Sequence, residues 1–163
     1  MTEKQIQNKI FLNLQDRNRQ NEKTIFFDIT PNVWIFDWES DILFKNSEDF
    51  IFEMEIKTSL QDYQNDFINK KKKHDKLANA KEDSFVPAYF YFVVPVGIVD
   101  IETFPIYAGL YEYQIFEGEL IMNLTKQAPR LTEKKANKTD TIKMLRSTSF
   151  KYWRGRTGQQ TRK

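Results

Sequence analysis

The sequence predicts a single domain with a mixed α/β fold, in which a β-sheet is flanked by helices. Segments with apolar residues at helical spacing occur near both ends and in the middle of the chain, and segments of strand character lie between them. The length of 163 residues suits one hydrophobic core, and an aromatic content of 15% supplies ample apolar volume for it. We therefore expect one domain over residues 1–154, followed by a flexible basic tail over 155–163.

The periodicity of the chain gives the expected elements and their order. Ile6 and Ile10 fall on one face of a first helix, which Thr2 and Gln5 can cap reciprocally. The continuously apolar run Ala88–Val94 lies between two prolines, as expected of a central strand that is buried on both faces. The predicted elements are a helix over 3–19, strands over 24–30 and 33–38 with a turn at Pro31-Asn32, the second strand running on toward 41–44, a polar connection of hairpin length over 45–49, a strand over 50–58, a long charged helix over 60–80, a strand over 88–94, a strand over 106–113 with a hairpin partner over 114–123, and a helix over 139–153.

Several classes of protein are excluded by what the sequence lacks. There is no cysteine, which excludes disulfides, thiolate zinc sites and a cysteine nucleophile. The five glycines are scattered singly, so there is no glycine-rich phosphate loop of an NTPase. No segment approaches the roughly 20 apolar residues of a membrane span, and the polar N-terminus lacks the apolar run of a signal peptide. We expect a soluble, intracellular protein with no membrane partner.

Charge is distributed unevenly along the chain, although the net charge is only +2. Lys70–Lys73 is an unbroken basic run, and the segment from Lys143 to the end carries seven basic residues and no acidic one. Acidic residues concentrate between Asp37 and Asp66. An acidic centre flanked by basic segments is typical of a metal-using enzyme that acts on a polyanion. Solvated helix faces are the alternative explanation of the lysine run.

The most informative segment is the predicted strand over 50–58. Side chains alternate along a strand, so Glu53, Glu55 and Lys57 project from one face while the apolar residues between them face a core. Asp41, on the preceding predicted strand, can point toward the same face. A solvated edge strand would show the same alternation, so the pattern alone leaves a surface role open.

Two carboxylates and a lysine on one face suit the hydrolysis of a phosphodiester. A hard cation such as Mg²⁺ or Mn²⁺ prefers oxygen ligands, which Asp41, Glu55 and the main-chain carbonyl of Ile56 can supply. Lys57 would then face the scissile phosphate or the attacking water and stabilise the developing charge. Paired carboxylates also serve glycosidases, but a glutamate and a lysine on one strand face suit a metal and a phosphate better.

The same residues resemble the PD-(D/E)XK nuclease superfamily, and in particular its small bacterial and phage domains that are similar to DNA-repair nucleases. The likeness continues downstream and covers residues 3–131, although Ser40 stands where the signature has a proline. The residues that carry it are Asp41, Glu55-Ile56-Lys57, Ser59, Asp62-Tyr63, Asp66, Lys70, Lys73-His74, and the segments 88–95, 105–110 and 126–131.

The resemblance implies a restriction-endonuclease-like αβββαβ core and magnesium-dependent cleavage of DNA by a cytoplasmic protein encoded by a bacterium or a phage. The metal-binding acids of the family fall on Asp41 and Glu55, and its lysine falls on Lys57. Many members carry a further glutamate in the first helix, for which Glu3 is the first candidate and Glu22 the second. Members often dimerise to cut two strands, so a homodimer is one expectation. Glu53 competes with Glu3 as an additional metal ligand, and Glu39 is either a ligand or a solvent-facing charge.

A second group of residues is expected to bind the DNA. Asp66, Lys70, Lys73 and His74 share one face of the charged helix at helical offsets, and phosphate contact by these lysines is favoured over base recognition. Ser59 is expected to cap that helix and also to touch phosphate. The predicted nucleic-acid contacts are Ser59, Lys70, Lys73, His74, Lys151 and Arg154.

Two other functions remain open from the sequence. A non-catalytic DNA-binding or assembly module can retain the nuclease fold, and a nuclease of this type can act on RNA. The roles of Trp34, Trp38 and Trp153 also remain open, because the sequence does not distinguish docking in the core from contact with nucleic acid.

Overall fold

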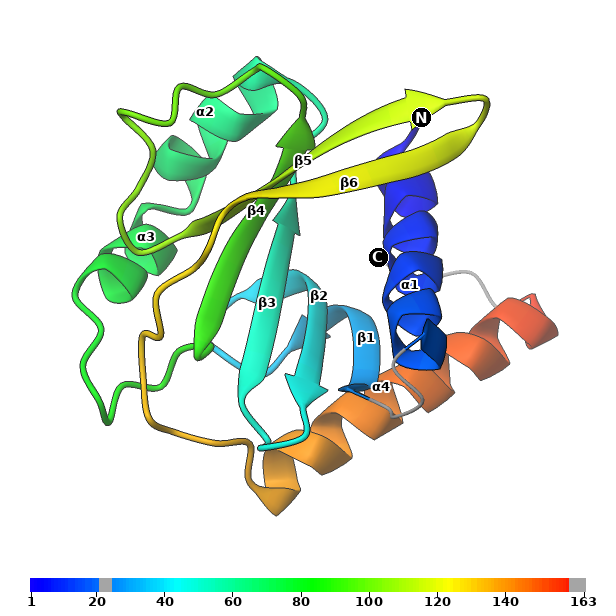
Figure 1. Ribbon diagram of the computed structural model, residues 1–163. Helices are drawn as coiled ribbons and strands as arrows, with labels where there is room; N and C mark the ends of the chain where they lie inside the picture. Colours follow the sequence, from blue (N-terminus) through cyan, green and yellow to red (C-terminus); the bar gives the residue numbers. More distant parts are fainter. Residues whose placement is uncertain (21–24, 159–163) are drawn as a thin grey trace.

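The computed structural model describes residues 1–20 and 25–158 and contains a six-stranded mixed sheet with helices on both faces (Figure 1). The predicted mixed α/β class is confirmed. The elements are α1 (Glu3–Gln20), β1 (Phe26–Trp34), β2 (Glu39–Asn46), β3 (Ile51–Ile56), α2 (Leu60–Asn69), α3 (Lys71–Ala78), β4 (Tyr89–Pro95), β5 (Gly109–Phe116), β6 (Glu119–Lys126) and α4 (Lys138–Thr157).

The strands lie in the sheet in their order along the chain. The first three form an antiparallel meander, β3, β4 and β5 run parallel to one another, and β6 returns antiparallel to β5. The apolar strand β4 therefore lies inside the sheet with a parallel neighbour on each side, as its composition predicts. The Glu117-Gly118 turn joins β5 to β6 with both residues at positive φ, which fits a tight hairpin.

The alternation predicted for β3 is present and divides the molecule into two cores. Met54 and Ile56 pack on the face that α1 covers, together with Ile6 and Ile10 of that helix. The opposite face of the sheet is covered by α2 and α3, and Leu77 of α3 packs there against β4 residues. Glu53 and Glu55 point into this second layer, so the alternative of a solvated strand face is wrong.

The long helix predicted over 60–80 is divided into two. Lys70 leaves the helical conformation, with φ −114° and ψ 33°, and separates α2 from α3. Its side chain reaches Glu55 of β3, and the change of direction lets Lys73 and His74 of α3 turn toward the sheet. Partners elsewhere in the fold therefore override the continuous helical pattern.

The predicted turn at Pro31-Asn32 and the separate strand over 33–38 are wrong. Pro31 and Asn32 belong to β1, and residues 35–38 form the bend that leads into β2. Pro31 fits within the strand because β1 is at the edge of the sheet, where a missing backbone donor is tolerated. The irregular backbone sits instead at Asp28 and Asn32, which have positive φ, and at a register shift between Phe27 and Thr30.

The C-terminal helix packs against β1 and buries Met144 in the core (Figure 1). Asn137 and Asp140 form its capping box, and it ends at Gly158 in the left-handed conformation. The helix includes Gly155 to Thr157, so the tail does not begin at residue 155, and residues 159–163 lie outside the described part of the chain. Within the described residues, no helix combines the length and apolar character needed to cross a membrane.

Gly109 at the start of β5 is a position where the fold requires glycine. A Cβ atom there would meet the Tyr91 ring and would lie 2.6 Å from the backbone nitrogen of Ala128. We expect Gly109→Ala to destabilise the protein by about 1–3 kcal/mol, as overpacking does in a close-packed interior. Thermal or urea unfolding of the variant and the parent measures this loss of stability. The control is Gly155→Ala in α4, where a Cβ meets no atom within 4 Å and helix propensity favours alanine. Equal stability of the Gly109→Ala variant and the parent would contradict the packing account.

Candidate active site

The candidate site is built on the neighbouring strands β2 and β3, which bring the predicted residues together. Asp41 of β2 lies beside the end of β3, where its Oδ2 accepts a hydrogen bond of 2.7 Å from the Ile56 amide. Glu53 and Glu55 of β3 and Lys57, which follows that strand, share the face that α2 and α3 cover. The Lys57 amide donates to the Val93 carbonyl of β4 at 2.9 Å and so continues the sheet past the last residue of β3.

Glu55 is the hub of the site. Its side chain is fully buried, and ammonium groups from three lysines bind its two oxygens. Lys57 lies 2.8 Å from Oε1, Lys73 lies 2.6 Å from Oε2, and Lys70 makes a further ion pair with Oε1. A buried carboxylate is costly unless it is paired, and here the lysines of one strand and of the α2–α3 junction provide the pairing.

A series of polar contacts through Asp66, His74 and Tyr107 holds the Lys57 ammonium in place. Its ammonium lies 2.7 Å from Oδ1 of Asp66, and Oδ2 of the same aspartate lies 2.8 Å from Nε2 of His74. The Tyr107 hydroxyl lies 2.8 Å from Nδ1 of His74. A proton on Nε2 satisfies the contact with Asp66, since the carboxylate can only accept, and the Tyr107 hydroxyl can serve the contact at Nδ1. Asp66 and His74 therefore position Lys57.

Glu53 occupies the inner end of the same face. The indole N–H of Trp38 donates to both of its oxygens at 3.0 Å, and Lys73 lies 2.6 Å from Oε1. Trp38 is buried, which settles the question that the sequence left open for this residue. Tyr107 and Trp38 are the residues that the sequence did not assign to the site. For Tyr107 a signal existed, because it falls within the segment 105–110 that carries the family resemblance.

The two acids that face one another across the strands differ in ionisation. Burial and, secondly, the negative charge of Glu55 raise the pKa of Asp41 to about 8, against a smaller lowering by the hydrogen bond from the Ile56 amide. Burial also acts to raise the pKa of Glu55, but Lys73 and the other lysines outweigh it and the pKa is lowered. For Lys57, burial acts to lower the pKa, yet Glu55 and Asp66 outweigh it and the pKa is raised. Glu55 is thus ionised and Lys57 charged, whereas Asp41 holds a proton near neutral pH.

The N-terminus of α1 also reaches the site. Gln7 donates through Nε2 to Glu3, to Asn32 and to the Asp41 carbonyl, at 3.4, 2.6 and 3.3 Å. Burial and then the charge of Glu55 raise the pKa of Glu3. Glu3 therefore lies within the electrostatic reach of Glu55, while Glu22, the second candidate of the first helix, lies outside the described residues.

The potential metal donors of the site are the carboxylate oxygens of Asp41 and Glu55. Within residues 1–20 and 25–158, no three histidine or acidic side chains converge closely enough to form a ready metal centre. The pair Asp41 and Glu55 nevertheless has the donor chemistry that Mg²⁺ prefers. The pKa of Asp41 is raised mainly by burial and secondly by the charge of Glu55, and a cation would offset the second of these causes. Lys70, whose side chain is 35% exposed, provides part of the positive charge there.

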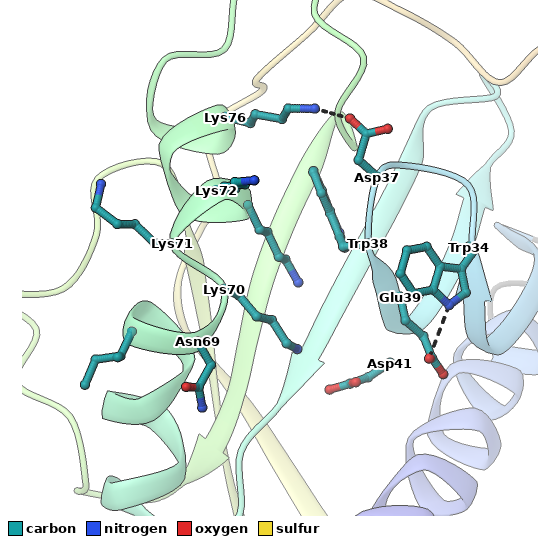
Figure 2. A pocket seen from close by; sticks show the side chains of 12 residues that line it. Trp34, Asp37, Trp38, Glu39, Asp41, Asn69, Lys70, Lys71, Lys72 and Lys76 are labelled. Carbon is teal, nitrogen blue, oxygen red and sulfur yellow. Dashed lines mark hydrogen bonds and ion pairs between the residues drawn. The ribbon is translucent and has the colours of Figure 1, made fainter. Parts of the chain in front are cut away.

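A pocket of about 950 Å³ opens beside these acids (Figure 2). Asp41 and Lys70 point toward one another within it, and residues of α2 and α3 face residues of the β1–β2 connection across it (Figure 2). The lining residues are Trp34, Asp37, Trp38, Glu39, Asp41, Ile68, Asn69, Lys70, Lys71, Lys72, Lys73 and Lys76. The opening gives a ligand access to Asp41 from solvent, while Glu55 lies behind it and is fully buried.

The residues predicted to contact nucleic acid occupy different environments in the structure. Lys73 and His74 are buried, so they belong to the interior of the site and do not form a DNA-facing surface. They are buried because Lys73 pairs with Glu55 and His74 with Asp66, contacts that a helical pattern of charges does not reveal. Ser59 caps α2, accepting from the Asp62 amide at 3.1 Å, as predicted. The Lys151 ammonium binds backbone carbonyls of β1 and so docks α4.

Arg154 and Glu39, the two remaining candidates, make their contacts outside the cluster around Glu55. Arg154 lies on the same helix, with its guanidinium 4.6 Å from the centre of the Phe150 ring. Glu39, considered as a further ligand, is exposed and accepts from the indole N–H of Trp34 at 3.3 Å. Neither residue contacts Glu55 or Lys57.

Comparison with known proteins gives the fold and no function. No family model and no curated protein matches the chain. A solved structure described as "SPO1766 protein of unknown function from Silicibacter pomeroyi" is similar, with a TM-score of 0.57, 14% sequence identity, and coverage of 90% of this chain and 89% of that one. At this identity the likeness concerns the fold alone.

Proposed function

We propose that this protein is a metal-dependent nuclease that hydrolyses DNA phosphodiester bonds, with Asp41, Glu55 and Lys57 at its active centre. One observation carries the proposal. The partly buried Asp41 and the fully buried Glu55 lie on adjacent strands, share one sheet face with the buried Lys57, and Asp41 opens on a lysine-lined pocket. Perturbed acids in a cleft mark candidate sites of catalysis, and lysines beside them suit a polyanionic substrate.

The order of elements supports a restriction-endonuclease-like core. A helix, an antiparallel meander of three strands, a helical segment and a strand parallel to the third follow one another in the expected αβββαβ sequence. In this arrangement Asp41 belongs to the second strand of the meander and Glu55 and Lys57 to the third. This order of elements supports the proposal.

Asp41 and Glu55 would hold Mg²⁺ or Mn²⁺. The Ile56 carbonyl is a suitable third ligand, because the amide and carbonyl of one strand residue point toward the same neighbour, and the Ile56 amide binds Asp41. Glu3 is a better additional ligand than Glu53, since Glu3 is exposed at the start of α1 within the electrostatic reach of Glu55, whereas Glu53 is fully buried against Trp38 and Lys73. The cation would supply a polarised phosphate oxygen and a bound water of lowered pKa.

Lys57 would stabilise the negative charge that develops on the phosphate. Asp66 and Glu55 hold its ammonium in one orientation, and His74 with Tyr107 holds Asp66 in turn. A charge fixed in this way needs little reorganisation during the reaction, which is the basis of electrostatic catalysis. Lys70, at the mouth of the pocket, is the lysine best placed to meet the substrate backbone.

The test is a cleavage assay on linear, circular and single-stranded DNA, and on RNA, with Mg²⁺, with Mn²⁺ and with EDTA. The proposal expects cutting of DNA that depends on the metal. Folded protein that binds DNA and cuts nothing with either metal would identify a non-catalytic module. Cutting of RNA with no cutting of DNA would identify a ribonuclease.

Lys57→Ala tests the assignment of the lysine. We expect a loss of about 10²- to 10³-fold in the cleavage rate, the scale seen when one charge-stabilising donor is removed. The fold should persist, because Lys70 also pairs with both Glu55 and Asp66. Circular dichroism checks the fold, and Lys4→Ala, an exposed lysine of α1, is the control. Undiminished metal-dependent cutting by Lys57→Ala would remove Lys57 from the active centre.

A further inference from the structure

We infer that the pocket beside Asp41 binds an unpaired nucleotide, with its base stacked on Trp34 and its phosphates on the lysines of the opposite wall. This inference deepens the proposed function and rests on it, because it names single-stranded DNA or a frayed duplex end as the substrate class. The volume of about 950 Å³ lies at the upper end of the range for small-ligand sites, about 300–1,000 Å³.

Trp34 is the first observation. Its side chain stands at the end of β1, is 61% exposed, and lines the pocket. Among the described residues its ring makes no aromatic or cation–π contact, so a face of the indole is free for a ligand. The bond of the indole N–H to Glu39 at 3.3 Å restrains the ring (Figure 2). An oriented, exposed indole is a stacking platform, and every nucleobase has a π-face that fits one.

The opposite wall is cationic. Lys70, Lys71, Lys72 and Lys76 come from the α2–α3 junction and α3 and line the same pocket. Lys71 pairs with Asp75 at 2.9 Å and Lys76 pairs with Asp37, but Lys72 has no ion-pair partner within the described residues. An exposed and unpaired ammonium is available to a phosphate, and its binding releases counterions from the nucleic acid.

The two walls of the pocket differ in charge, and this difference orients a bound nucleotide. Asp37 and Glu39 stand on the tryptophan wall, where they would repel a phosphate but can accept hydrogen bonds from base amino groups. Lysines stand on the other wall. A nucleotide has an uncharged aromatic base at one end and an anionic phosphate at the other. The base therefore suits the tryptophan wall, and the phosphate suits the lysine wall. Asp41 then lies between them, beside the position of the phosphate.

Stacking on Trp34 requires a base with one face uncovered. In a continuous duplex each base is covered on both faces by its neighbours, so an indole cannot stack on it unless the base is unstacked. Single strands and frayed ends present such bases without that cost. The pocket thus favours unpaired over paired DNA.

The test measures binding without cleavage, by fluorescence anisotropy of labelled oligonucleotides in EDTA. We expect single-stranded oligo(dT) to bind more tightly than a duplex of equal length. Trp34→Ala should weaken single-strand binding by about 5- to 100-fold and leave an abasic oligonucleotide unaffected. Lys72→Ala should lower the slope of log K against log salt by about 0.7, the value for one phosphate contact on a single strand.

The matched control is Trp153→Ala in α4, whose side chain is 58% exposed and does not line the pocket. The inference is overturned if duplex binds as tightly as single strand, or if Trp34→Ala and Trp153→Ala behave alike. Trp34-dependent binding by a protein that cuts nothing with Mg²⁺ would refute the nuclease and retain the nucleotide pocket. Metal-dependent cutting and binding that ignore Trp34 would refute the pocket alone.

Discussion

The Asp41→Asn variant is expected to lose metal-dependent cleavage and to gain stability at neutral and alkaline pH. An amide is a far poorer ligand for Mg²⁺ than a carboxylate, so we expect the cleavage rate to fall by at least about 10²-fold. Asparagine can still accept the hydrogen bond of the Ile56 amide through its side-chain oxygen. The fold is therefore retained while the metal chemistry is lost.

The gain in stability follows from the raised pKa of Asp41. Burial and the charge of Glu55 raise it to about 8, whereas an aspartate in the unfolded chain has a pKa of about 3.9. The folded chain thus binds the proton more tightly, and stability is lost as the pH rises from about 4 to about 8. Asparagine avoids this loss. At pH 8 we expect the variant to be more stable than the parent by at least about 1 kcal/mol, which corresponds to about 2–4 °C in Tm.

Thermal unfolding between pH 5 and pH 9 in EDTA, with the cleavage assay run in parallel, measures both effects. Asp16→Asn is the control, because Asp16 is an exposed acid of α1 and pairs only with Arg19 among the described residues. It should keep cleavage, and its Tm should follow that of the parent. A stability gain for Asp41→Asn that shrinks with rising pH would contradict the ionisation described for this pair.

Lys73→Met is expected to destabilise the protein by about 3–5 kcal/mol, the range for removing one partner of a buried ion pair. Lys73 is only 3% exposed and bridges Glu53 and Glu55 at 2.6 Å each. Methionine keeps much of the volume but leaves two buried carboxylates short of a cation. For a chain of this size the change corresponds to a fall in Tm of about 6–20 °C.

The neighbouring Lys72→Met provides the matched control. Lys72 is exposed and unpaired within the described residues, so its substitution should change Tm by less than about 2 °C. Chemical denaturation of both variants at pH 7 gives the comparison. Equal stabilities for the two methionine variants would show that the Glu53–Lys73–Glu55 bridge is not a determinant of the fold.

The strand that carries the site was predictable because the alternation of its apolar and charged residues lies within a few consecutive positions. Two-residue alternation in β3 was enough to separate Met54 and Ile56 from Glu55 and Lys57, and the structure has that separation. The adjacency of Asp41 was also predictable, since a short connection joins β2 and β3 into a hairpin. The assignment of chemistry to these residues stays a proposal.

The second layer was not predictable, because its partners are distant in sequence. A lysine run on a helical pattern suggests a solvated face, and only the acids of β3 explain why Lys73 is buried. The break at Lys70 has the same origin, since its ion pair with Glu55 joins residues 15 positions apart. Pro31 gave a misleading turn signal because the edge position of β1 cannot be inferred from its own sequence.

The three lysines around Glu55 also bear on how the chain folds. Lys57, Lys70 and Lys73 neutralise Glu55 with charges that belong to the polypeptide itself. Many small metalloproteins instead rely on their ion to offset the repulsion of buried ligands, and they unfold when it is chelated. In this protein the partly exposed Lys70 is the group that an arriving cation would replace. If the protein binds a metal as proposed, its entry would exchange one cation for another in a chain that is already folded, and folding would not require the metal.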